Sequence, residues 1–196
     1  MKDIKYILFD TDWVVVHSDM WSNEYSRRTQ LPISAMKEFF AYDFQNCLVG
    51  KADLKEVLPQ YLHSWGWKWT AEEYLINWFE YENKPDTELV KVIQKLRKLY
   101  LCYVATNQEK YRLAYLRDTM GFWDNFDGIF CSAEMGVKKP EVAFFNYILE
   151  KLGTQDPSEV LYFDDAEENI KTAMSLGIQC VLFRSIDDLA SIMNNQ

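Results

Sequence analysis

Continuously apolar runs and amphipathic stretches alternate along most of this chain. The first run, Tyr6-Ile7-Leu8-Phe9, is typical of a strand buried on both faces of a parallel sheet. Further strand-like runs occupy 99–107, 126–132, 159–166 and 178–183. Stretches with helical spacing lie between them at 110–120, 141–153 and 168–177. This alternation predicts βαβ units, and therefore an α/β fold in which a parallel sheet carries helices on both faces.

The segment between the first strand and this repeat has a different pattern. Residues 17–84 contain no convincing long β run, and helical spacing recurs at 34–48, 53–65 and 71–82. We interpret residues 17–84 as a small α-helical cap domain inserted into a Rossmann-like core made of 1–16 and 85–196. Two chain crossings between the domains would permit a lid.

Composition narrows the classes of protein. A chain of 196 residues can bury one ordinary core and a small insert. The net charge of −9 gives no general attraction for nucleic acid or an anionic membrane, so an anionic substrate would need a local positive site. No apolar run reaches membrane-spanning length and no signal-like stretch opens the chain, so we expect a cytoplasmic protein that is a monomer or weak dimer. We expect the four scattered cysteines to be reduced residues of the core: Cys47, Cys102, Cys131 and Cys180.

Polar residues follow the predicted core strands where the strands end. They are Asp10 and Asp12, then Thr106 and Asn107, then Ser132 with Lys139-Pro140, and finally Asp164 and Asp165. In an open parallel sheet, ligands bind beyond the carboxyl ends of the strands, so we expect these residues to share one site. Two acids one residue apart are costly unless a cation or shared proton lies near them, although a solvated turn is the alternative for DTD alone.

The residue types at these ends suit phosphate and magnesium. Asp10 and Asp165 can hold Mg²⁺, which prefers octahedral oxygen coordination by acids, waters and substrate phosphate, and Asp164 would add a further charge beside it. The Thr106 hydroxyl and the Lys139 ammonium could hold phosphate oxygens. Cation and lysine together would neutralise the repulsion between an attacking carboxylate and a phosphate dianion.

Four short segments match one family in order and spacing. FDTDWV (9–14), YVATN (103–107), GVKKPEVAFF (136–145) and YFDDAEENI (162–170) resemble the four motifs of the haloacid dehalogenase-like superfamily of aspartate-nucleophile phosphotransferases. The resemblance covers the chain apart from details of the insertion, which lies where C1-type helical caps lie. The cap is also similar, less specifically, to those of sugar phosphatases related to the epoxide-hydrolase N-terminal domain.

The resemblance implies a role for each acid of the first motif. Asp10 would be the nucleophile that forms an aspartyl-phosphate. Asp12 would be the general acid for the leaving alcohol and then the base for water, and its backbone carbonyl would join the Mg²⁺ shell. The dehalogenases that name the superfamily carry no acid at the position of Asp12, so phosphoryl chemistry is favoured.

The other motifs supply the remaining roles that the resemblance implies. Thr106 and Lys139 would hold the phosphate, and Asp165 would bind the metal with Asp164 close by. Asn107 has two interpretations, a substrate contact or a helix cap. Asn169 likewise could hold a metal-bound water or face solvent.

Two residues depart from the family pattern. Trp13 stands where glycine is common, and His17 stands where many members have an acid. Either change could narrow the substrate range or lower activity. His17 and His63 complete no triad or ligand set, so we expect structural roles for both. The tryptophans of the insertion should form core, with one or two lining the cap side of the active site.

The sequence therefore supports several hypotheses. The first is a Mg²⁺-dependent phosphatase acting on a small phosphorylated metabolite such as a sugar phosphate, through an aspartyl-phosphate. The alternatives are a phosphomutase of the same fold and a catalytically weak binding or regulatory member, for which Trp13 is the hint. A phospho-accepting receiver module is disfavoured by chain order, because Asp164 and Asp165 come last, after the lysine.

Overall fold

Five parallel strands form the centre of the protein in the computed structural model, which describes residues 3–189. In spatial order they are β3 (Gly128–Cys131), β2 (Leu101–Thr106), β1 (Tyr6–Phe9), β4 (Val160–Asp164) and β5 (Gln179–Leu182). Phe9 at the end of β1 is in register with Val104 of β2 and Phe163 of β4. The predicted parallel α/β sheet is confirmed, and every strand lies within an apolar run of the sequence.

Helices of the core follow the strands, as the alternation predicts. They are α7 (Thr87–Leu96), α8 (Lys110–Asp118), α9 (Phe122–Asn125), α10 (Ser132–Met135), α11 (Val142–Leu152) and α12 (Glu167–Ser175), with short 3-10 turns at Pro157–Glu159 and Ile186–Leu189. The predicted helices at 110–120, 141–153 and 168–177 correspond to α8, α11 and α12.

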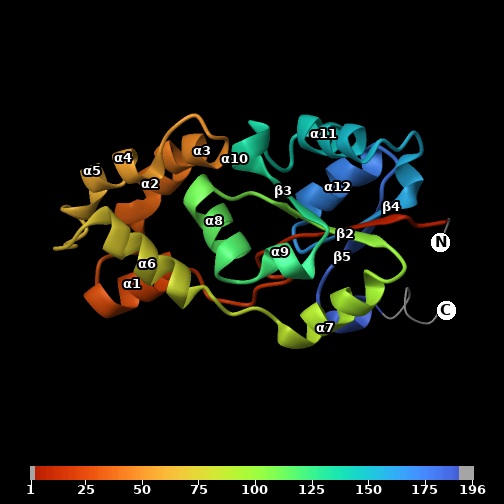
Figure 1. The fold of residues 1–196 in the computed structure, drawn as a ribbon. Coiled ribbons are helices and arrows are strands. Elements are labelled where there is room, and N and C mark those ends of the chain that lie inside the picture. Colours follow the sequence, from red (N-terminus) through yellow and green to blue (C-terminus); the bar gives the residue numbers. More distant parts are fainter. Residues whose placement is uncertain (1–2, 190–196) are drawn as a thin grey trace.

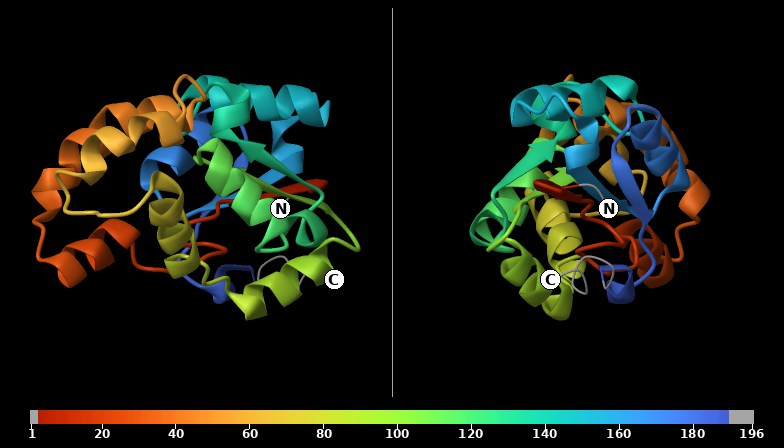
Figure 2. Two further views of the ribbon diagram at one scale, coloured as in Figure 1. Left: turned by 60° about the vertical axis from the view of Figure 1, so that its left-hand side comes forward. Right: turned by 90° about the vertical axis from the view of Figure 1, so that its right-hand side faces the viewer.

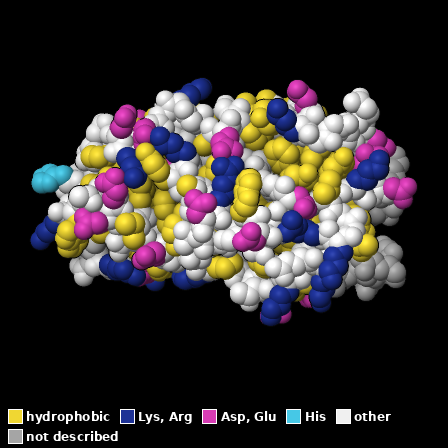
Figure 3. All heavy atoms as spheres, viewed as in Figure 1, with side chains coloured by type: hydrophobic (Ala, Val, Ile, Leu, Met, Phe, Trp, Pro, Cys, Tyr) yellow, Lys and Arg dark blue, Asp and Glu magenta, His cyan; other side chains and the backbone are white. Residues whose placement is uncertain are grey.

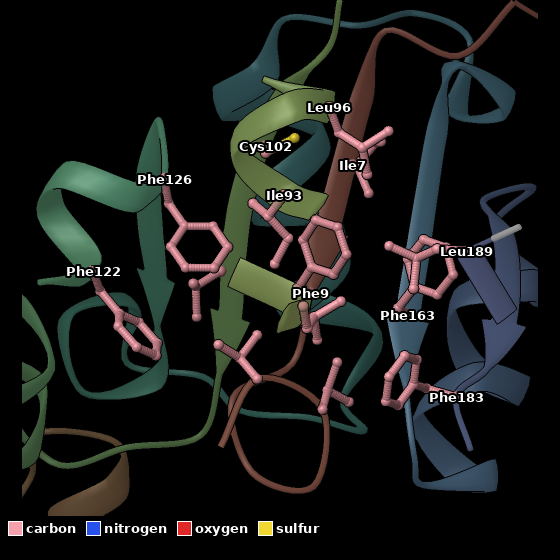
Figure 4. Packing of buried hydrophobic residues seen from close by; sticks show 14 of the residues in the cluster. Ile7, Phe9, Ile93, Leu96, Cys102, Phe122, Phe126, Phe163, Phe183 and Leu189 are labelled. Carbon is pink, nitrogen blue, oxygen red and sulfur yellow. The ribbon is translucent and has the colours of Figure 1, made fainter. Parts of the chain in front are cut away.

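The sheet buries apolar side chains on both faces. On one face, Phe9 stacks on Phe163 with ring centroids 5.3 Å apart, and Ile93 of α7 packs against the same cluster (Figure 4). On the other, Leu8 and Tyr162 pack under α11 and α12. Figure 2 shows helices on both sides of the sheet. Burial on both faces explains why the strands read as continuous apolar runs rather than alternating ones.

Only helices lie between β1 and α7. They are α1 (Trp21–Thr29), the 3-10 turn η1 (Ile33–Met36), α2 (Lys37–Ala41), α3 (Asp43–Leu48), α4 (Leu54–Val57), α5 (Pro59–Leu62) and α6 (Ala71–Tyr81). The predicted helical cap is therefore present, and each of the stretches 34–48 and 53–65 forms two short α-helices. Residues 34–48 break at Tyr42, and 53–65 break before Pro59, whose missing amide cannot continue the hydrogen-bond ladder.

The cap has a hydrophobic core of its own, made largely of aromatic rings. Trp21, Phe39, Trp65 and Tyr74 are buried in it, and several of the rings meet edge to face. Trp65 therefore fulfils the expected core role, whereas Trp69 is 63% exposed. A separate core supports the division into two units, and the boundaries 17 and 84 remain our proposal.

The cap lies beyond the carboxyl ends of the strands, as Figure 1 shows with α1 to α6 on the left and the sheet on the right. Polar contacts fasten it to the core: Asp53 of the cap accepts a bond of 2.6 Å from Lys110 of α8. Gly50 brings the two backbones together, since a Cβ there would lie 2.5 Å from the carbonyl oxygen of Ala133. The enclosed space between cap and strand ends is where the sequence places the site.

The surface has no broad field of one charge on the face shown in Figure 3, where acidic and basic side chains are interspersed. Among the helices of residues 3–189, none combines the length and the apolar character that crossing a bilayer demands.

Candidate active site

The first carboxylate and the lysine meet at the end of β1. The amide of Asp10 donates to the Phe163 carbonyl at 2.9 Å, which continues the β1–β4 ladder past the last strand residue. The Lys139 Nζ lies 2.6 Å from Asp10 Oδ1 and 2.8 Å from Asp164 Oδ2. All three side chains are nearly buried. The structure thus brings together three of the predicted site residues from three separate motifs.

Burial and mutual charge shift the titration of this cluster. Burial raises the pKa of Asp10 well above its ordinary value, more than the Lys139 ammonium lowers it, and Asp164 adds to the rise. Burial also works to raise the pKa of Asp164, but the charge of Lys139 and the hydrogen bonds from Lys139, Tyr162 and the Ala166 amide together outweigh it, and the pKa falls. Burial opposes charge on Lys139, yet the two carboxylates together raise its pKa. One lysine therefore leaves the buried acids undercompensated, which favours a bound cation.

Asp164 is held rigidly from three sides. It accepts hydrogen bonds from the Ala166 amide at 2.8 Å, from the Tyr162 hydroxyl, and from Asn169 Nδ2 at 3.0 Å to each carboxylate oxygen. Asn169 is buried, so the interpretation that it faces solvent is wrong, and its amide positions Asp164. Asp165 is half-buried, and no other residue in the described part of the chain donates a hydrogen bond to its carboxylate. Its oxygens are thus available to a ligand.

Three carboxylates converge in a way that fits a hard divalent cation. Asp10, Asp164 and Asp165 each offer one oxygen, and these oxygens all lie within 4.8 Å of one another. An all-oxygen, strongly acidic donor set suits Mg²⁺. The carboxylate of Asp12 is not part of this group, and its proposed contribution through the backbone carbonyl stays a prediction.

Thr106 ends β2 with an unused donor. Its side chain is buried, and its Oγ1 has no hydrogen-bond partner among the described residues. A buried hydroxyl without a partner is costly, so a ligand oxygen at this point would satisfy it. Thr11 Oγ1, beside the nucleophile position, is buried and unpartnered in the same way. The geometry fits the phosphate-holding role that the sequence analysis gives to Thr106.

Asn107 connects two loops of the site. Its Nδ2 donates to the Lys139 carbonyl and its Oδ1 accepts from the Lys139 amide, each at 2.9 Å. The helix-cap interpretation is wrong, because Glu109 caps α8 by accepting from the Tyr111 and Arg112 amides. Its role as a substrate contact stays a prediction.

Ser132 and Lys138, which lie near these residues, make contacts of their own. The Ser132 hydroxyl donates to the Gln108 carbonyl at 3.3 Å and supports the same loop. Lys138 donates to Gln45 of the cap, whereas Lys139 is the buried lysine at the acids.

Asp12 faces the space under the cap. Gln108 Nε2 donates to its Oδ2 at 2.8 Å, and solvent reaches the carboxylate through that space. The surrounding protein nevertheless displaces water, and this desolvation raises the pKa of Asp12 against the opposing charges of Arg112 and Lys139. A carboxyl with a raised pKa holds a proton at higher pH than an ordinary aspartate, as a general acid must.

Trp13 adopts a backbone conformation that glycine reaches easily. Its φ is 60°, in the left-handed region that costs a bulky residue free energy. The side chain is half exposed and lies over the space beside Asp12. His17 Nε2 donates to the Val14 carbonyl oxygen at 2.9 Å and lies 3.9 Å from Asp86 Oδ2, outside the acid cluster. His63 is exposed on the cap.

A family model decides the identity of the fold. The model described as haloacid dehalogenase-like hydrolase matches residues 4–177. The chain belongs to the haloacid dehalogenase-like hydrolases. The match includes all four motifs, so the family resemblance and the hydrolase class predicted from them are confirmed.

Solved haloacid dehalogenase-like structures share the whole fold, cap included. A family enzyme from Bacteroides thetaiotaomicron, crystallised as a magnesium complex, superposes with a TM-score of 0.83 at 23% identity, covering 98% of this chain and 99% of that one. A predicted family hydrolase from Porphyromonas gingivalis gives 0.81 at 22% identity, covering 99% and 100%. At such identities the likeness concerns the fold.

Two curated relatives in the family are phosphatases. A sesquiterpene phosphatase of Aspergillus oryzae is 32% identical over 111 residues, which are 56% of this chain. The chain thus spans about half (55%) of that protein. A D-ribitol-5-phosphate phosphatase of Bacteroides thetaiotaomicron is 27% identical over 142 residues, 69% of this chain and 68% of that protein.

A cavity of about 330 Å³ connects this haloacid dehalogenase-like site with the cap. Asp12 and Gln108 form its floor on the core side, and Phe44, Trp78 and Glu82 belong to its cap side. Trp78 fulfils the expectation that one tryptophan of the insertion lines the site. Gln108 and Glu82 were not anticipated; Gln108 could have been found because it follows Thr106 and Asn107 at the same strand end.

Proposed function

We propose that this protein is a Mg²⁺-dependent phosphatase that hydrolyses a small phosphomonoester through an aspartyl-phosphate on Asp10. The observation that carries the proposal is the position of Lys139 between Asp10 and Asp164, together with the unpartnered hydroxyl of Thr106 at the end of the neighbouring strand β2. A nucleophilic carboxylate, a buried positive charge and a free donor are what phosphoryl transfer to an acid requires.

In the first step Asp10 attacks phosphorus and the bond from phosphorus to the leaving oxygen breaks. The Thr11 amide donates to Asp10 Oδ1 at 2.7 Å and Lys139 pairs with the same oxygen, which leaves Oδ2 for the attack. Lys139 and Thr106 hold phosphoryl oxygens. Mg²⁺, held by Asp10, Asp164 and Asp165, would neutralise charge on the phosphate.

Asp12 donates a proton in the first step and accepts one in the second. Its raised pKa favours the protonated form, which delivers a proton to the departing alkoxide so that an alcohol leaves. The resulting carboxylate then accepts a proton from water as that water attacks the phosphorus. The phosphorus–Asp10 bond breaks, and inorganic phosphate and the free Asp10 carboxylate are regenerated. The bond from Gln108 holds Asp12 in place during both transfers.

The two curated relatives support hydrolysis of phosphate esters, although their named substrates carry organic groups of opposite polarity. Hydrolysis is favoured over a mutase, which would have to bind a second phosphate in the cavity. No lysine, arginine or histidine is among the described residues that line it.

The test is release of inorganic phosphate from alkyl, sugar, nucleotide and aryl phosphates, with and without Mg²⁺. We expect Mg²⁺-dependent turnover that falls by about 10³-fold or more in Asp10→Asn, since nucleophile removal costs at least this much. Asp124→Asn, an exposed acid on α9, is the matched control and should behave like wild type. Equal activity in Asp10→Asn, or none in the wild type, would refute the proposal.

A further inference from the structure

The wall of the cavity that faces Asp12 is mostly apolar. Of the lining residues, the apolar ones come from both units: Trp13 from the core, and Met20, Phe40, Phe44, Leu48 and Trp78 from the cap. Because Asp12 is the proposed donor to the leaving oxygen, the part of the substrate beyond that oxygen must lie against this wall.

Three of these rings form a preassembled surface. The Phe40 and Phe44 centroids are 5.4 Å apart, Phe44 and Trp78 are 5.6 Å apart, and Phe40 and Trp78 are 5.9 Å apart. Rings that already pack on one another do not have to be ordered when a ligand arrives, so binding to them costs little conformational entropy. The wall is a ready apolar surface rather than a gap left by loose side chains.

The wall has few polar groups, and most of them already form hydrogen bonds within the protein. Asn107 is bonded to the Lys139 backbone through both ends of its amide, and Gln108 is bonded to Asp12. Glu82 accepts from the Trp21 amide at 2.7 Å. Ser18 is the one hydroxyl among the described lining residues. A polyol in this cavity would therefore leave several hydroxyl groups without partners, which is penalised heavily.

The charge of the wall excludes a second class of substrate. Its two ionisable lining residues, Asp12 and Glu82, are both acidic, and no basic residue is among those described. A carboxylate or second phosphate on the organic group would lose water here and find no basic side chain among the described lining residues to compensate it.

From this wall we infer that the preferred substrate is the phosphate monoester of an apolar alcohol, alkyl or aryl, rather than of a sugar. The inference rests on the proposed function and names the organic group that the same site accepts. The cavity of about 330 Å³ lies within the range of about 300–1,000 Å³ that small organic ligands occupy. Each methylene buried on the wall should raise kcat/KM about threefold to fourfold until the cavity is full.

The experiment compares esters that differ only in the organic group. Pentyl phosphate and a pentitol 5-phosphate carry the same number of carbons and a primary alcohol as leaving group, and butyl, hexyl and octyl phosphates extend the series. We expect kcat/KM for pentyl phosphate to exceed that for the pentitol ester by about tenfold or more. Within the alkyl series, kcat/KM should increase with chain length.

Variants of the lining residues test whether the wall causes the preference for apolar esters. Trp13→Gly and Met20→Gln alter half-exposed lining residues, so the fold should tolerate both. Each should flatten the dependence of kcat/KM on chain length. Trp69→Ala is the control, because Trp69 is an exposed cap tryptophan that is absent from this cavity, and it should keep the full dependence.

The outcomes separate the two proposals. Hydrolysis of the pentitol ester as fast as pentyl phosphate, or an alkyl series without slope, would overturn the apolar assignment and keep the phosphatase. Octyl phosphate that quenches tryptophan fluorescence in the wild type but not in Trp13→Gly, with no phosphate released from any ester, would keep the assignment and overturn the phosphatase. Neither binding nor turnover of octyl phosphate would overturn both.

Discussion

The acid cluster of the core and the cap wall of the neighbouring cavity are held in place in different ways. On the core side, ionisable groups are fixed one by one: Lys139 by two carboxylates, and Asp164 by donors on three sides. On the cap side, Phe40, Phe44 and Trp78 are held mainly by the packing of their rings on one another. Under the proposed function, the core would carry out the chemistry at phosphorus, and the cap would select the phosphate ester that enters.

The largest expected effect separates chemistry from binding at Asp12. Asp12→Asn should lower kcat for an alkyl phosphate by about 10²–10⁴-fold, because the alkoxide then leaves without a proton. For p-nitrophenyl phosphate, whose leaving group needs no proton, the first step should survive and phosphoenzyme should accumulate as a burst. Rapid-quench measurement of nitrophenol and phosphate distinguishes the steps. An equal loss of first-step rate for both esters would show that Asp12 does not act as the acid.

A smaller effect is expected at Glu82, where cap and core meet. Burial raises the pKa of Glu82 to about 7, and its Oε2 lies only 3.9 Å from Arg112 Nη2. Between the unfolded value near 4.5 and about 7 the folded state binds more protons, so Glu82 lowers stability as pH rises through this window. Glu82→Gln should add about 1–3 kcal/mol to the free energy of unfolding at pH 8 and almost nothing at pH 4.

Urea unfolding at the two pH values measures this difference. Glu80→Gln serves as the control and should follow the wild type at both pH values, because Glu80 is an exposed glutamate of α6, the helix whose C-cap is Glu82. Destabilisation of Glu82→Gln at pH 8 would mean that the pairing with Arg112 outweighs burial, and the junction would then be held by charge, like the core side.

The smallest effect concerns the backbone of Trp13. Trp13→Gly and Trp13→Ala remove the same ring, but only glycine relieves the left-handed φ of 60°. Glycine should be more stable than alanine here by about 0.5–1 kcal/mol, the strain relieved less the entropy that glycine adds to the unfolded chain. At Trp123, exposed within α9, the same pair should reverse in sign, since alanine is the better helix former. Thermal unfolding of the four variants gives both differences; no reversal would remove strain as the explanation.

The sequence predicts the core far better than the cap. Buried parallel strands impose continuous apolar runs, and ligands at strand ends impose polar residues there, so Asp10, Thr106, Lys139 and Asp164 were visible as a pattern. The structure joins Asp10, Lys139 and Asp164 by ion pairs, and it places Thr106 at the end of β2, the strand next to β1. Their individual catalytic roles stay predictions, as does the separate role of Asp165.

The cap resisted prediction for physical reasons. The α1 segment WSNEYSRRT places few apolar residues in a helical stripe, because Trp21 and Tyr25 carry most of its burial, so it was not named as a helix. Glu82 and Gln108 act through contacts with residues far away in the chain, with Arg112 and Asp12 respectively, and such partners leave no periodic signal. The α7 helix was likewise not predicted, although the Asp86 side chain caps it by accepting hydrogen bonds from the Glu88 and Leu89 amides.

The amide of Asn107 reproduces the pair of bonds that one residue of a neighbouring strand would offer to Lys139. The side chain of Asn107 thus extends the hydrogen-bond pattern of the sheet by one residue pair beyond the ends of the strands. These two hydrogen bonds, rather than the course of the preceding chain, therefore fix the position of Lys139 relative to β2. The connection through α10 can consequently change in length or composition, and contact the cap differently, while the ammonium keeps its place between the carboxylates.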